Sequence, residues 1–133
     1  MISELTRQTP APAVVSWLDA LPAGEVATTA ITAAELLYGV ARLPDGRRKT
    51  GLSVAVSELL KDDFEGRVLS FDQLAAGRYA EVVSGRDQLG SPIGKADAQI
   101  AAICSAVGAT LATRNTAHFV DTGIELINPW VLA

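Results

Sequence analysis

The chain has 133 residues, 49% of them hydrophobic, which is typical of one compact domain, and we expect a single domain over residues 1–133. No apolar run approaches the roughly 20 residues of a membrane-spanning helix, and the N-terminus does not resemble a secretory signal, so we expect a cytoplasmic protein without a membrane partner. The formal net charge of −4 argues against a domain that holds nucleic acid mainly by a strong basic field.

Short strands and helices are expected to alternate along the chain. In chain order we expect a proline-initiated helix at about 13–20, a strand at 26–31, helices at 33–43 and about 47–62, a strand at 67–71, helices at about 73–87 and 95–107, and strands at 110–113 and 124–127. Strands separated by helices imply right-handed crossovers and a parallel sheet with helices on both faces. Cys104, the only cysteine, is expected to be a small buried hydrophobe.

Two acidic residues stand near the starts of predicted helices. Glu35 follows the strand at 26–31, and open α/β sheets bind ligands at the carboxyl ends of their strands. A structural alternative is the capping box Thr32-x-x-Glu35, in which Glu35 only accepts a hydrogen bond from the backbone of Thr32. Asp97 is expected in the first turn of helix 95–107, where the helix dipole alone favours a carboxylate. Because that helix is so apolar, a carboxylate there would be partly desolvated, and two such carboxylates could share a divalent cation.

Two more polar side chains follow the strand at 110–113. Asn115 can coordinate a cation or orient a water molecule, although an Asx turn at a strand end explains it equally well. His118, the only histidine, is a candidate general base, but a single histidine in a loop is more often a surface or packing residue.

An RNA substrate would have to be met by local positive charge, because the chain as a whole is acidic. The candidates for RNA contact are Arg42, Arg47, Arg48 and Arg114, and other possible sources of local charge are Lys49, Arg78, Arg86 and Lys95. Taken singly, each is better explained as a solvated surface charge. A small-molecule α/β enzyme finds little support, because the sequence has neither a Gly-rich phosphate loop nor a nucleophile elbow.

Four segments occur in a recognisable order and cover nearly the whole chain: residues 30–39 (AITAAELLYG), 66–72 (GRVLSFD), 95–102 (KADAQIAA) and 109–115 (ATLATRN), closing with Ile127-Asn-Pro-Trp130. Together they resemble the PIN-domain family, more specifically its VapC/FitB-like toxin branch. The resemblance implies an α/β fold, a PIN-like α/β/α sandwich with a central parallel sheet. It also implies a Mg²⁺- or Mn²⁺-dependent endoribonuclease toxin that hydrolyses RNA phosphodiester bonds and is held inactive by a cognate antitoxin protein.

The resemblance also implies roles for three residues. Glu35 and Asp97 match the family's second and third acidic residues and are expected to be catalytic metal ligands. Asn115 matches the fourth position, where members carry Asp or Asn. The apolar segments around Trp17, Leu36, Leu37 and Tyr38 predict a homodimer and a groove for an antitoxin segment.

Two positions depart from the family's pattern. The family begins with a short apolar strand ending in Asp-Thr-Asn, and residues 1–5 of this chain resemble the segment after that strand, so we expect the first strand and first catalytic aspartate to be absent. Many members with Asn at the fourth position have Asp before Phe, where this chain has His118 before Phe119. We favour a late start codon, because losing a central strand would leave its neighbours unpaired. The alternative function is a catalytically impaired PIN-like domain that dimerises or binds an antitoxin.

Overall fold

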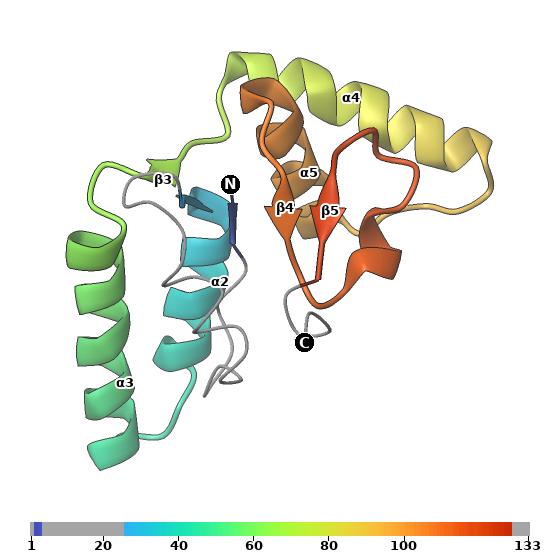
Figure 1. Ribbon diagram of the computed structural model, residues 1–133. Helices are drawn as coiled ribbons and strands as arrows, with labels where there is room; N and C mark the ends of the chain where they lie inside the picture. The colour runs from blue at the N-terminus through green and yellow to red at the C-terminus, as the bar shows by residue number, and fades with distance from the viewer. Residues whose placement is uncertain (1, 4–25, 129–133) are drawn as a thin grey trace.

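The computed structural model describes residues 2–3 and 26–128, and its helices and strands alternate along the chain (Figure 1). The elements are β1 (Ile2–Ser3), β2 (Thr28–Thr29), α2 (Ala30–Ala41), α3 (Arg47–Glu58) with a π-helical turn η1 (Leu59–Asp63), β3 (Val68–Leu69), α4 (Gln73–Gln88), α5 (Lys95–Val107), β4 (Leu111–Ala112), a 3-10 turn η2 (Thr116–Phe119) and β5 (Leu126–Ile127). The helix expected at about 13–20 lies outside the described residues. No helix in the described part is long and apolar enough to span a bilayer.

Every strand pairing in the described part of the chain is parallel, as expected. The pairings form two small sheets, of order β1-β4-β5 and β2-β3, where one central sheet was expected, and β1 contacts β2 without a ladder between them. Each strand has two residues, so few backbone groups are available for a continuous ladder. Figure 1 shows α2 and α3 together at one end of the molecule and α4 and α5 at the other.

A strand is present at the N-terminus, which corrects the expectation that the first strand would be absent. Ile2 and Ser3 pair with Leu111 and Ala112, so β4 has a partner on both sides. The side chains of β4 are completely buried, and unpaired backbone groups at that depth would be costly. The expectation was wrong because it followed the family's sequence pattern, whereas pairing needs only a short extended segment with free backbone groups.

The start of α2 differs from its prediction by two residues. The helix begins at Ala30, and Thr29 is its N-cap, whose Oγ1 accepts a 3.0 Å hydrogen bond from the backbone N–H of Thr32. Thr29 Oγ1 also donates to Thr32 Oγ1 at 3.0 Å, and both side chains are buried. Thr32 is therefore the third residue of the helix and not its cap.

The core lies between α4, α5 and the strands. Ala98 and the run from Ile100 to Cys104 are buried along α5, as its apolar sequence predicted, and Phe119 and Leu111 pack into the same cluster. Gly108, at φ 67°, ends α5 in the left-handed conformation that favours glycine. This packing fixes the two ends of α5, and its N-terminal end carries Asp97.

Candidate functional site

The described structure brings Asp97 and His118 together. The Nδ1 atom of His118 lies 3.5 Å from Oδ2 of Asp97, and the two side chains are 60% and 31% exposed, so the pair is open to solvent on the His118 side. Asp97 is in the first turn of α5, as predicted, and Gly94 precedes the helix without a side-chain cap. The carboxylate therefore faces a partner that the sequence alone presents as a surface residue.

Asp97 reaches the carboxyl end of β4 from a helix and does not follow a strand. We expected Glu35 and Asp97 each to come directly after a strand, and only Glu35 lies on a helix that does so. The element before α5 is α4. Because α5 leads into β4 through a tight turn, its first turn lies beside the far end of that strand, where η2 begins, and α5 contacts η2.

The loop that carries His118 is held in place by a buried arginine. Arg86, on α4, is 5% exposed; its Nη1 donates to the carbonyl oxygens of His118 and Val120 at 3.0 and 3.1 Å, and its Nε donates to the carbonyl of Ser91 at 2.6 Å. The interpretation of Arg86 as a source of local charge for RNA is wrong, because its guanidinium is buried against backbone carbonyls. The sequence contains a signal for this role, since Ala75, Val82 and Arg86 share the buried side of α4.

Asn115 follows β4 at the start of the same loop. Its backbone N–H donates to Oγ1 of the buried Thr113 at 3.1 Å, and its carbonyl accepts from the backbone N–H of His118 at 3.0 Å. The first of these bonds is a local turn at the strand end, which is the structural role that the sequence left open. The backbone of Asn115 is thus tied to the residue that contacts Asp97.

Glu35 lies in the second turn of α2 and is exposed. With Thr29 as the cap, α2 has no acidic residue in its first turn, so the proposed capping box Thr32-x-x-Glu35 is wrong. Among residues 2–3 and 26–128, no group of three or more His, Cys, Asp or Glu side chains is arranged to hold a metal ion. Helices α2 and α5 contact each other, which puts Glu35 and Asp97 on neighbouring elements.

The candidate RNA-contacting arginines are all exposed: Arg42, Arg47, Arg48 and Arg114. The guanidinium of Arg42, at the end of α2, lies 5.9 Å from the ring centroid of Tyr38, within the range of a cation–π contact. Arg47 and Arg48 begin α3, whereas Arg114 follows β4 in the loop that contains His118. The positive charges therefore lie on different elements and not in one patch.

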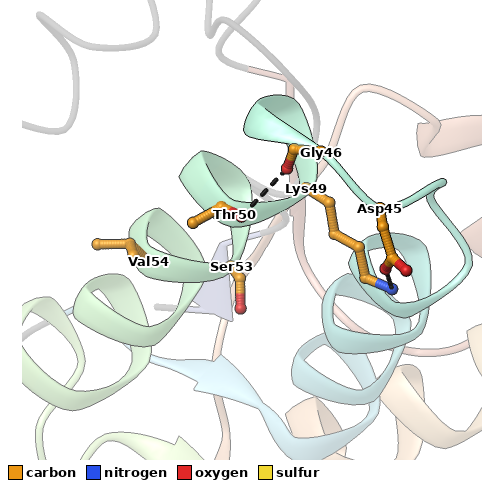
Figure 2. A pocket seen from close by; sticks show the side chains of 6 residues that line it. All are labelled: Asp45, Gly46, Lys49, Thr50, Ser53 and Val54. Carbon is orange, nitrogen blue, oxygen red and sulfur yellow. Dashed lines mark hydrogen bonds and ion pairs between the residues drawn. The ribbon is translucent and has the colours of Figure 1, made fainter.

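An open pocket of about 340 Å³ lies at the start of α3 (Figure 2). Figure 2 shows the side chain of Lys49 directed at Asp45, and its Nζ lies 3.5 Å from Asp45 Oδ1 and 3.2 Å from the carbonyl of Ala41. Six residues line the pocket: Asp45, Gly46, Lys49, Thr50, Ser53 and Val54. None of the candidate catalytic residues is among them, and its one lysine is already paired, so this pocket is not the candidate site.

Comparisons with known proteins identify the family. The PIN domain family matches residues 1–124. The chain is 40% identical over 130 residues to the VapC ribonuclease Y4jK of Sinorhizobium fredii, covering 98% of this chain and 93% of that protein. It is 39% identical over 130 residues to Toxin FitB of Neisseria gonorrhoeae, covering 98% and 94%.

Solved structures agree with the sequence matches. The crystal structure of FitAcB from Neisseria gonorrhoeae superposes with a TM-score of 0.89 at 37% identity, over 99% of this chain and 100% of that one. A structure of FitAB bound to a DNA fragment gives the same TM-score at 36% identity, over 100% and 98%. The expected PIN-like α/β fold is thus confirmed, and the chain belongs to the PIN-domain family, in its branch of VapC- and FitB-like toxins.

Proposed function

We propose that this protein is a metal-dependent endoribonuclease toxin of a toxin–antitoxin pair, built as one PIN-like domain over residues 1–133 and located in the cytoplasm. The observation that carries the proposal is the placement of Asp97 at the start of α5, partly buried, beside His118 and the loop after β4. A carboxylate that only capped a helix would need no such neighbour. The family's named relatives include a ribonuclease and a toxin, and this supports the reaction class.

The donor atoms available fit a divalent ion such as Mg²⁺ or Mn²⁺. Glu35 and Asp97 offer carboxylates and Asn115 an amide oxygen, which are the ligand types that hard cations prefer. Glu35 and Asp97 would hold the ion, and Asn115 would assist them by orienting a water molecule. When bound, the ion would lower the pKa of a water molecule and neutralise charge on the scissile phosphate.

This chain's own residues would arrange the site around such an ion. Asp97 is held by a helix in which Ala98 and Ile100 are buried, so its carboxylate cannot move far from the carboxyl end of β4. Partial burial of that carboxylate, 31% exposed, lowers the local dielectric and strengthens its attraction for a cation. Arg114 follows β4 and is exposed in the same loop, where it would meet an RNA phosphate.

The proposed protein partners are a cognate antitoxin and a second copy of this chain. Several large apolar side chains are exposed on α2 and α3: Leu37, Tyr38, Leu52 and Val54. Leu37 and Tyr38 are 52% and 67% exposed, which is typical of residues covered by a partner. Both proposals also rest on the likeness to the FitAcB and FitAB structures.

Cleavage of a mixed RNA substrate by the purified protein, with Mg²⁺ or Mn²⁺ and with EDTA, tests the reaction. We expect cleavage only with the metal ion, and we expect Asp97→Asn to abolish it while the variant keeps the thermal stability of the wild type. A protein that binds its neighbouring gene product but cleaves no RNA with either ion would establish the alternative, a PIN-like binding module.

A further inference from the structure

The contact between His118 and Asp97 has a length that an ordinary ion pair does not explain. Charge-assisted hydrogen bonds between a nitrogen and a carboxylate oxygen are about 2.7–2.9 Å long. The 3.5 Å between Nδ1 and Oδ2 is clearly longer. Two atoms bound to one metal ion at about 2.1 Å each, with about 90–110° between the bonds, lie about 3.0–3.5 Å apart. The spacing therefore fits two ligands of a shared ion better than a direct hydrogen bond.

The backbone that carries His118 is fixed on both sides of the residue. Its N–H donates to the carbonyl of Asn115 at 3.0 Å, and its carbonyl accepts from the buried guanidinium of Arg86 at 3.0 Å. The side chain of Phe119, the next residue, is 1% exposed and packs in the core. The imidazole is consequently presented to Asp97 by a loop with little freedom to withdraw it.

We propose that His118 is a nitrogen ligand of the metal ion held by Asp97, and that it makes the site prefer a divalent transition metal over Mg²⁺. Imidazole nitrogen binds first-row transition metals well, whereas Mg²⁺ prefers oxygen ligands in strict octahedral geometry. The proposal rests on the metal site of the proposed function, and it adds a ligand that neither the family resemblance nor the sequence pattern assigned.

Calorimetric titration with Co²⁺ and with Mg²⁺ at one fixed pH tests this on the wild type, His118→Asn, His118→Asp and Asp97→Asn. We expect His118→Asn to weaken Co²⁺ binding by about 10- to 100-fold, the usual effect of losing a group that supports a metal, and to change Mg²⁺ binding much less. His118→Asp should shift the preference toward Mg²⁺, because it replaces the nitrogen by a carboxylate oxygen. At 60% exposure, the side chain can be replaced without loss of the fold.

A second readout uses the fact that the chain has only one histidine. Imidazole NMR signals of the wild type belong to His118 alone, and direct ligation of paramagnetic Co²⁺ should move them far outside their normal range. Equal loss of Co²⁺ and Mg²⁺ affinity in His118→Asn, or no loss of either, would overturn the inference. If Asp97→Asn still abolished binding in that case, the proposed metal site would stand. A wild-type protein that bound neither ion would overturn both.

Discussion

The guanidinium of Arg86 donates a 3.0 Å hydrogen bond to the backbone carbonyl of His118, joining α4 to the loop after β4. The same Nη1 atom bonds the carbonyl of Val120 at 3.1 Å, and Nε bonds that of Ser91 at 2.6 Å. One buried cation thus satisfies three backbone acceptors from two loops. The position of His118 beside Asp97 depends on this arginine as much as on the strand before it.

Replacing Arg86 with Met should destabilise the protein by about 2–4 kcal/mol, because buried carbonyls that lose their donor carry a large desolvation cost. Chemical denaturation measures the change. Arg78→Met on the same helix is the matched control; Arg78 pairs with Glu81 at 3.7 Å, both side chains are substantially exposed, and we expect a change below about 1 kcal/mol. Equal effects of the two substitutions would show that burial of Arg86 does not matter.

The cap of α2 gives a prediction that separates Thr29 from Glu35. Thr29→Ala removes the oxygen that accepts from the N–H of Thr32, and it should cost about 1–2 kcal/mol of stability. Thr29→Ser keeps the oxygen and should cost clearly less. Glu35→Ala changes an exposed residue outside the first turn, so its effect should stay within about 0.5 kcal/mol. Thermal unfolding of the three variants checks this order; a large loss in Glu35→Ala would restore the capping role.

Contacts between RNA phosphates and the arginines at the start of α3 would show in the salt dependence of binding. Replacing Arg47 and Arg48 together with Ala should lower the slope of log affinity against log salt by about 1.4, at about 0.7 for each single-strand phosphate contact. A matched pair of exposed cations elsewhere, Lys61 and Arg78, serves as the control and should leave the slope nearly unchanged. Filter binding of RNA without divalent ions gives the slopes, and equal slopes for both double variants would remove Arg47 and Arg48 from the RNA surface.

Local sequence signals predicted the elements well where one force dominates. The bounds of α5 were predicted correctly because its apolar run, starting after a glycine and ending at Gly108, leaves a single solution. Asp72 was correctly expected to cap α4, and its Oδ1 accepts from the N–H of Ala75 at 2.9 Å. The start of α2 was placed late because Thr29 and Thr32 are equally good caps in isolation, and only burial of both selects Thr29.

Features that depend on distant parts of the chain were not predictable. The pairing of β1 with β4 joins segments about a hundred residues apart, and no local pattern in Ile2 and Ser3 announces it. The contact between Asp97 and His118 depends in the same way on how α5 packs against η2. The residue types of the candidate site were therefore readable from the sequence and from its family resemblance, but their spatial partners were not.

The most direct test of a metal site at Asp97 is calorimetric titration of Mn²⁺ into the wild type, Asp97→Asn and Asp72→Asn. Both substitutions change a carboxylate to an amide near a helix start, and Asn caps α4 about as well as Asp, so both variants should keep the fold. We predict that Asp97→Asn weakens Mn²⁺ binding by at least about tenfold, while Asp72→Asn binds as the wild type does. Wild-type binding that survives Asp97→Asn unchanged, or no binding by the wild type, would contradict a metal site at Asp97.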